Sequence, residues 1–322
     1  NISFIVSGSN PSYLSTIAKK RLQRRADQKF MLPLALSEIL VHENILTTSM
    51  VNIFQKILWE YKKIDEIEIP EISLTDHLSQ LVPSYFIYGG LPLAFLSENN
   101  IDKLKEIKLT VERGFDLFST DNKSIAEIIK VELASLQSQE FSYKNILEKT
   151  RLRQRSIVNE VIDDLMNHGY IIKRTPFLFN EKKTTYLTIF SYIDPGIVSY
   201  LTGEYDFNSV KGSQIEGYCH SRLSYFCANS SLKSELFYYR PYELDHRQNI
   251  RYLAGEVDFI FKHGKKYIPI EVKATAELSD IKINTLATLI EKHKLPFGVV
   301  LYGGVPYLSK KDKILFWPYW MV

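Results

Sequence analysis

The sequence predicts a multidomain chain that joins a helical part to an α/β part. Three observations predict this fold class. The chain has 322 residues, which is too long for one small core. Helical patterns dominate residues 33–117. From about residue 205, helical segments alternate with short runs of valine, isoleucine and aromatic residues, as in α/β proteins.

The composition is that of a folded soluble protein, with 45% hydrophobic and 24% charged residues. No apolar run reaches the roughly 18 residues that span a bilayer, and no signal peptide opens the chain. Cys219 and Cys227 are eight residues apart on one expected helix, which separates them by about 12 Å and excludes a disulfide. Free thiols are typical of a reducing compartment. We therefore expect a cytoplasmic protein without a membrane partner.

The basic residues are clustered although the net charge is only +3. One cluster occupies residues 19–29 and a second lies within residues 151–183. Patches of this kind can bind phosphate groups, and they can also be solvated helix faces. None of the seven histidines has zinc-site spacing, so a histidine-based metal site is not expected.

The first residues, NISFIVSGSN, have the pattern of a buried strand that ends at a turn, and a helical pattern follows. This is the strand-to-helix junction of a parallel sheet, but one strand cannot form a sheet. Its partners are expected in a preceding segment or in another chain. Further helices are expected over residues 33–64, with a break near Thr47, over 73–81, over 83–97, with a break at GGLP (Gly89 to Pro92), and over 101–117.

Residues 124–190 predict three helices followed by a β-hairpin, which is the order of a winged helix-turn-helix. The third helix of such a module enters the major groove, and the hairpin contacts phosphates. Arginine suits guanine and asparagine suits adenine. The candidate DNA-contacting residues are Arg151, Arg153, Arg155, Ser156 and Asn159 on this helix and the turn before it, and Lys173, Arg174, Lys182 and Lys183 on the hairpin. A packing or protein-docking role is the alternative.

The C-terminal part predicts a helix over 213–230, a strand, a hairpin that includes GEVDFIF and IPIEVKA, a crossover helix and two further strands. The last strand is rich in aromatic residues. They can form an interface, but a buried last strand is the favoured interpretation. These aromatic residues are Phe316, Trp317, Tyr319 and Trp320.

Three charged residues of the predicted hairpin indicate a metal-dependent site. Glu271 and Lys273 share one face of a strand, and Asp258 lies on the preceding strand within reach of them. Glu216 on the upstream helix can add a fourth group. Asp258 and Glu271 would supply the oxygens that Mg²⁺ or Mn²⁺ prefers, and Lys273 would orient water or offset charge on a scissile phosphate.

This arrangement resembles the PD-(D/E)XK, or restriction-endonuclease-like, nuclease fold. The proline of the motif name is absent, and Val257 precedes the aspartate. The resemblance implies phosphodiester hydrolysis at Glu216, Asp258, Glu271 and Lys273. The alternative is a nuclease-like scaffold whose charges persist while its function is binding.

Motifs spread along the chain resemble the C-terminal two-thirds of a prokaryotic or archaeal AAA-like ATPase with a restriction-endonuclease-like domain. They are VSGSN, LQRR, PLALSEIL, YFIYGGLP, HGYIIKRTPF, YYR and GEVDF with IPIEVKAT. By this resemblance, Ser9 or Asn10 would sense a γ-phosphate and Arg25 would lie near a nucleotide. Arg24 replaces the usual glycine, and the GxxxxGK(S/T) phosphate loop is absent. ATP binding therefore needs an upstream half. Either such a half exists, which the unpaired first strand favours, or the phosphate loop has been lost.

The resemblance implies four regions and a function. Residues 1–40 would end a P-loop ATPase core, 41–120 would form a helical lid, 121–200 the winged helix-turn-helix and 201–322 the nuclease-like domain. The expected protein is a DNA-associated ATPase with an Mg²⁺-dependent nuclease-like domain. The alternative is a catalytically inactive, nuclease-like fold that binds DNA or protein in a regulatory or defence-type ATPase. DNA is the expected partner, and a protein partner or a homo-oligomer remains open.

Overall fold

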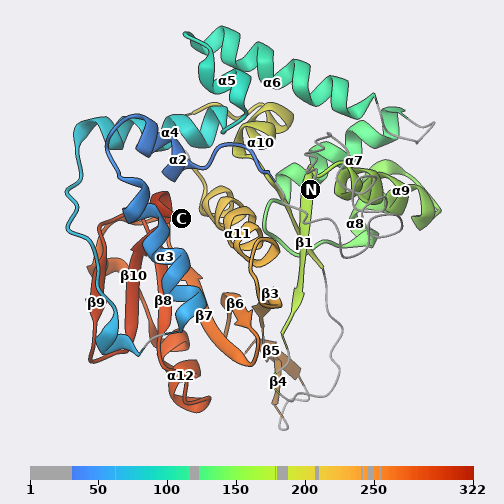
Figure 1. Ribbon diagram of the computed structural model, residues 1–322. Coiled ribbons are helices and arrows are strands. Elements are labelled where there is room, and N and C mark those ends of the chain that lie inside the picture. Colours follow the sequence, from blue (N-terminus) through green and yellow to red (C-terminus); the bar gives the residue numbers. More distant parts are fainter. Residues whose placement is uncertain are drawn as a thin grey trace, which may run out of the picture.

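The computed structural model places one long mixed sheet at the centre, with helices around it (Figure 1). The structure describes residues 31–61, 63–116, 123–177, 179, 188–206, 210–240, 242–245, 250–253 and 255–322. The predicted first strand and the predicted nucleotide-sensing residues Ser9, Asn10 and Arg25 lie outside these ranges, as do the wing residues Lys182 and Lys183.

The first described helices follow the predicted helical region. Thr47 caps the second of them and accepts a hydrogen bond from the Met50 backbone N–H at 3.4 Å, which confirms the predicted break. The prediction of separate helices before and after Pro83 was wrong, because α4 runs through this proline. Burial of the residues on both sides of Pro83 outweighs the cost of about 3 kcal/mol for a proline inside a helix. The bounds are α2 Leu36–His42, α3 Thr48–Glu60, η3 Ile64–Glu66, α4 Asp76–Tyr88, α5 Pro92–Leu96 and α6 Asn100–Phe115.

The two glycines after α4 are required by close packing. Gly89 has a φ of +69°, and a Cβ at this position would lie 2.0 Å from Oδ1 of Asp194. The Gly90 backbone N–H donates to Oδ2 of Asp194 at 2.7 Å, and a Cβ at Gly90 would lie 1.9 Å from the Leu34 carbonyl oxygen. The glycines of the GGLP motif therefore let the end of α4 pack against Asp194, the N-cap residue of α10.

Three helices and two antiparallel strands follow in the predicted order. They are α7 Lys123–Ser135, α8 Tyr143–Thr150, α9 Arg155–Asn167, β1 Ile171–Pro176 and β2 Ile189–Tyr192, and α10 Pro195–Thr202 comes next. Apolar residues at helical spacing on α7 and α9, such as Ile129, Val158, Val161 and Leu165, meet in one core. We call residues 123–192 the three-helix unit.

The C-terminal part forms three layers, as the α/β pattern predicts. Residues alternate between the two faces of each strand. Val299, Leu301 and Trp317 share a core with α3 and α11, whereas Val300 and Phe316 share a core with α12. The bounds are α11 Gly212–Ala228, β3 Ser234–Tyr239, β4 Tyr242–Asp245, β5 Ile250–Leu253, β6 Val257–His263, β7 Lys266–Val272, η4 Leu278–Asp280, α12 Asn284–Lys292, β8 Gly298–Tyr302, β9 Tyr307–Ser309, β10 Ile314–Pro318 and η5 Tyr319–Met321. We call residues 211–322 the α/β unit.

The eight-stranded sheet has the order β2-β1-β3-β6-β7-β8-β10-β9, and β4 and β5 form a separate pair. Strand β6 is antiparallel to both of its neighbours, while β7, β8 and β10 are parallel to one another. The helix α12 makes the crossover that parallel strands require. On the other side, β1 pairs in parallel with β3, with Thr175 opposite Phe237. The hairpin of the three-helix unit thus extends the sheet of the α/β unit.

The C-terminal aromatic residues fill the core, as predicted. Trp317 and Trp320 are fully buried, and Phe316 and Tyr319 are no more than 7% exposed. Cys219 and Cys227 are free thiols, which confirms that they form no disulfide. Across the described residues, none of the helices combines the length and the apolar character that crossing a bilayer requires.

Candidate functional site

The β6–β7 hairpin brings the predicted acids together. Phe259 pairs with Ile270, so the next step along the antiparallel ladder places Asp258 opposite Glu271. Oδ2 of Asp258 accepts a hydrogen bond from the Val272 backbone N–H at 2.7 Å. The sequence-based expectation that Asp258 reaches the strand of Glu271 is met.

The ExK residues share a face, as the two-residue period of a strand requires. The Lys273 ammonium lies 2.5 Å from Oε1 of Glu271. Both side chains are partly buried, with 33% and 16% of their surface exposed. This ion pair occupies only one of the two carboxylate oxygens of Glu271.

The fourth predicted residue, Glu216, comes from α11 and is paired with an arginine of another unit. Oε1 of Glu216 accepts from Nη2 of Arg174, which lies on β1. Nη1 of Arg174 donates to the backbone carbonyl of Asp258 at 2.9 Å. We call Glu216, Asp258, Glu271, Lys273 and Arg174 the acid cluster.

The prediction that Arg174 is a wing contact to DNA was wrong. Its side chain is 1% exposed, and its guanidinium lies over the Phe259 ring at 4.4 Å from the centroid. A buried guanidinium cannot contact a phosphate on a docked duplex. Local sequence gave no signal for this position, because it depends on the parallel pairing of β1 with β3.

Two carboxyl groups of the cluster, those of Asp258 and Glu271, resist ionisation. Burial raises the pKa of Asp258 well above its ordinary value, and the nearby charges of Glu216 and Glu271 raise it further. Burial also raises the pKa of Glu271. Burial is the largest single effect on Lys273 and works against its charged form, but the charge and hydrogen bond of Glu271 and the charges of Asp258 and Glu256 together outweigh it and raise the pKa of the ammonium. Positive charge placed among these groups would therefore be stabilised.

A divalent cation fits this donor set. Oε2 of Glu271 is buried and has no hydrogen-bond partner, which is costly for a carboxylate oxygen. Within the described ranges, no three histidine, cysteine, aspartate or glutamate side chains gather around one point. Mg²⁺ is commonly held by only one or two carboxylates, with water and substrate phosphate completing its coordination. Asp258 and Glu271 match that pattern.

A second set of ion pairs beside the cluster was not predicted. Nη1 of Arg240 lies 2.8 Å from Oε1 of Glu140, and the same guanidinium binds Glu256. Glu256 is close enough to raise the pKa of Glu271. The YYR and GEVDF motifs are thus explained by a contact between their charged residues, Arg240 and Glu256.

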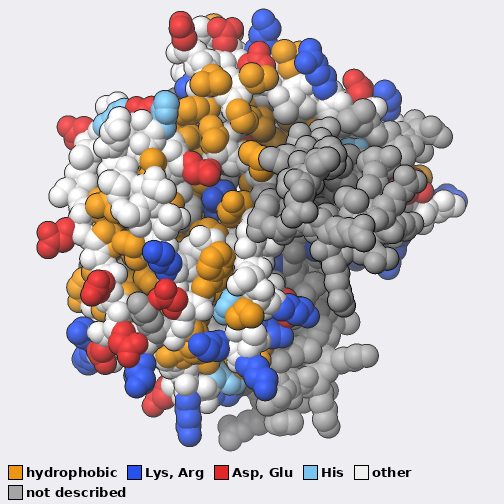
Figure 2. All heavy atoms as spheres, in the orientation of Figure 1, with side chains coloured by type: hydrophobic (Ala, Val, Ile, Leu, Met, Phe, Trp, Pro, Cys, Tyr) orange, Lys and Arg blue, Asp and Glu red, His pale blue; other side chains and the backbone are white. Residues whose placement is uncertain are grey.

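The predicted DNA-contacting residues of α9 lie together and are exposed. Helix α9 begins at Arg155, so Arg155 and Ser156 are in its first turn, and Arg151 and Arg153 precede it. Oδ1 of Asn159 accepts a hydrogen bond from the Tyr143 hydroxyl at 2.6 Å. Lys173 on β1 is exposed as well. On the face shown in Figure 2, basic and acidic side chains are interspersed over the described residues, as the small net charge predicts.

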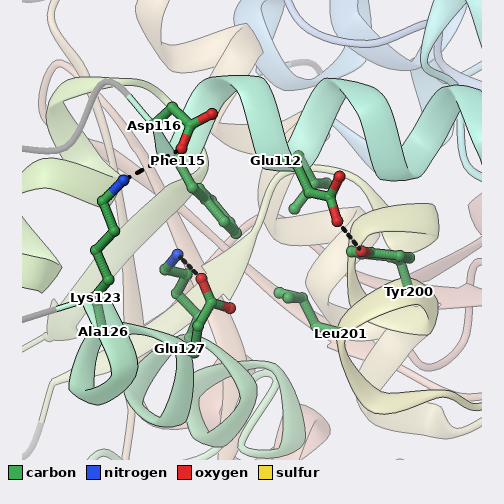
Figure 3. A pocket seen from close by; sticks show the side chains of 10 residues that line it. Glu112, Phe115, Asp116, Lys123, Ala126, Glu127, Tyr200 and Leu201 are labelled. Atoms are coloured by element: carbon green, nitrogen blue, oxygen red, sulfur yellow. Dashed lines mark hydrogen bonds and ion pairs between the residues drawn. The ribbon is translucent and has the colours of Figure 1, made fainter.

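A cavity of about 380 Å³ lies between α6, α7 and α10 (Figure 3). Its charged groups already pair with one another. Lys130 lies 2.6 Å from Glu127, Lys123 lies 3.6 Å from Asp116, and Tyr200 donates to a carboxylate of α6. This cavity presents none of the uncompensated negative charge that characterises the acid cluster.

The comparisons with known proteins bear on the α/β unit. Residues 211–322 match a family model described as a domain of unknown function, DUF4143. A search of curated proteins finds no match to the chain. The matched range contains Glu216, Asp258, Glu271 and Lys273, whereas Arg174 lies outside it.

Proposed function

We propose that the α/β unit hydrolyses phosphodiester bonds with Mg²⁺ or Mn²⁺ and that the chain is the C-terminal region of a DNA-associated AAA-like ATPase of the cytoplasm. The observation that carries the proposal is the buried, unpartnered Oε2 of Glu271 beside the strongly perturbed carboxyl of Asp258. Perturbed acids with an unmet electrostatic demand are typical of functional sites.

The topology supports the same proposal. The order of α11, β3, β6, β7, α12 and β8, with β6 antiparallel to both neighbours and with helices on both faces, agrees with a restriction-endonuclease-like fold. The three-helix unit, with its hairpin and its exposed arginines, agrees with a winged helix-turn-helix.

In the proposed reaction, Asp258 and Glu271 would hold the divalent ion. The bound ion would polarise the scissile phosphate and lower the pKa of a water ligand. Lys273 stays protonated because its pKa is raised, so it offsets negative charge on the phosphate and does not act as a base. The Val272 N–H fixes the Asp258 carboxyl through its 2.7 Å hydrogen bond. ATP hydrolysis would require a phosphate loop upstream of these residues.

A second candidate function is DNA or protein binding by a catalytically inactive unit. The pairing of Glu216 with Arg174 favours it, because the arginine already occupies one of the predicted catalytic acids. Exposed Arg151, Arg153 and Arg155 would serve DNA binding under either proposal.

The experiment that decides between the two is cleavage of single-stranded and duplex DNA and of RNA with Mn²⁺ and Mg²⁺. We expect cleavage that Asp258→Asn and Lys273→Met each reduce by at least about 100-fold, or about 2.7 kcal/mol. Asp280→Asn and Lys311→Met are matched controls, because both residues are exposed. No cleavage by the unmodified chain would favour the binding function, and cleavage that persists in both site variants would show that it does not arise at Asp258 and Lys273.

A further inference from the structure

Arg174 is the most deeply buried charge of the acid cluster, and it comes from outside the α/β unit. It reaches the cluster from β1, which is held beside β3 by parallel pairing. Figure 1 shows β1 alongside β3, with α11 next to them. Its Nη atoms contact Glu216 and the Asp258 carbonyl, whereas its Nε is buried without a hydrogen-bond partner. Burial of a guanidinium in this way is costly unless the surrounding negative charge compensates for it.

The other charges of the acid cluster suggest what compensates for the buried guanidinium of Arg174. When all five groups are ionised, the carboxylates of Glu216, Asp258 and Glu271 face the cations of Arg174 and Lys273. One net negative charge remains. A single divalent ion together with one phosphodiester makes the cluster neutral, and a second divalent ion would leave two excess positive charges. With Arg174 in place, the cluster therefore matches one ion.

The geometry leads to the same conclusion. Glu216 on α11 is 19% exposed and its charge acts on Asp258, but Arg174 already holds its Oε1. The guanidinium is planar, remains charged and is fixed by Phe259 and by the Asp258 carbonyl. It is a permanent cation held against the carboxylate that a second ion would need as a ligand.

We propose that Arg174 takes the place of a second divalent cation, so that the acid cluster binds one ion and Glu216 is not a metal ligand. This inference rests on the proposed function, since it concerns the same site. It makes the three-helix unit part of the catalytic arrangement, because that unit supplies a positioning residue for the cluster.

The test is the number of Mn²⁺ ions bound per chain, measured by electron paramagnetic resonance and isothermal titration calorimetry. We expect one ion for the unmodified chain and two for Arg174→Met. Adding Glu216→Gln to Arg174→Met should restore one ion. Arg174→Lys, which keeps the charge, and Arg153→Met, which removes an exposed charge, should each bind one ion.

A second measurement keeps the inference testable if Arg174→Met does not fold. Glu216→Gln alone should leave Mn²⁺ affinity within about threefold of the unmodified chain, since Arg174 and not the ion occupies this carboxylate. A loss of more than tenfold would make Glu216 a ligand and overturn the inference.

The outcomes separate this inference from the proposed function. One ion in both the unmodified chain and Arg174→Met overturns the role of Arg174 and leaves the proposed function standing. Binding by Arg174→Met alone would show that Arg174 excludes ions, but it would overturn the count of one ion for the unmodified chain and contradict the proposed metal-dependent function. No binding by either contradicts both.

Discussion

The acid cluster of the α/β unit and the exposed arginines before and on α9 show two different uses of charge. Asp258, Glu271 and Arg174 are held among apolar strands, and their partners are set by the fold. Arg151 and Arg153 are exposed to solvent around the start of α9. Enclosed charges strongly affect one another's ionisation, whereas exposed ones are screened. The first arrangement suits chemistry on a bound group, and the second suits salt-dependent contact with a polyanion.

The largest expected effect tests whether the exposed arginines before and on α9 bind DNA. Replacing Arg151, Arg153 and Arg155 together with alanine should weaken duplex DNA binding by roughly 100-fold at physiological salt, because three phosphate contacts are lost. The slope of log affinity against log salt should fall by roughly 2 to 3. Fluorescence anisotropy over a salt series measures both. The matched control replaces the exposed Lys310, Lys311 and Lys313, and an equal loss there would remove any special role of α9.

The next effect tests how the two units are joined. Arg240→Met removes the guanidinium that binds Glu140 of the three-helix unit and Glu256 of the α/β unit. We expect the free energy of unfolding to fall by about 2 kcal/mol, since charge-assisted hydrogen bonds are lost from a partly buried group. Denaturant unfolding measures it. A change below about 0.5 kcal/mol would show that the units are joined by the shared sheet alone.

The third effect concerns the pH dependence of stability that comes from Asp194, a buried carboxylate whose pKa is set by burial and by backbone N–H groups. Burial raises the pKa of Asp194 from 3.8 to about 6, although three backbone N–H groups favour the charged form. The folded state therefore binds the proton more tightly than the unfolded state, and stability should decline as pH rises through this window.

Asp194→Asn should abolish that decline. Its amide nitrogen would face the Gly90 N–H, so the variant should be less stable by about 1 kcal/mol at pH 7. Unfolding curves between pH 4 and 7 provide the measurement, with the exposed Asp65→Asn as the control. A variant that keeps the pH dependence would assign it to other groups.

The smallest expected effect concerns the buried charge of Asp258 in the acid cluster. Without metal, Asp258→Asn should raise the melting temperature at pH 8, because it removes a buried negative charge beside Glu216 and Glu271 and keeps an acceptor for the Val272 N–H. The gain should shrink as pH falls and the Asp258 carboxyl of the unmodified chain takes up its proton. Thermal unfolding with a chelator present measures it. A lower melting temperature at pH 8 would mean that the charge is already compensated within the chain.

Sequence patterns predicted what depends on short-range periodicity. The two-residue period placed Glu271 and Lys273 on one face, and the hairpin pattern placed Asp258 near them. The helix that carries Glu216 and the buried aromatic strand were predicted in the same way.

The contacts of Arg174 and Arg240 could not be predicted in this way. The contacts of Arg174 depend on parallel pairing between β1 and β3, which are separated in the chain by β2, α10 and α11, and those of Arg240 depend on the meeting of two units. No local pattern carries that information. The continuous helix through Pro83 has a similar cause, because tertiary packing outweighed a local preference.

The most direct test of the central claim is anomalous X-ray diffraction from crystals soaked in Mn²⁺. We predict one anomalous peak between the carboxylates of Asp258 and Glu271, within coordination distance of Oε2 of Glu271, and its loss in Asp258→Asn. No peak at this position in crystals of the unmodified chain, or a peak that remains in Asp258→Asn, would contradict the proposed metal-dependent site.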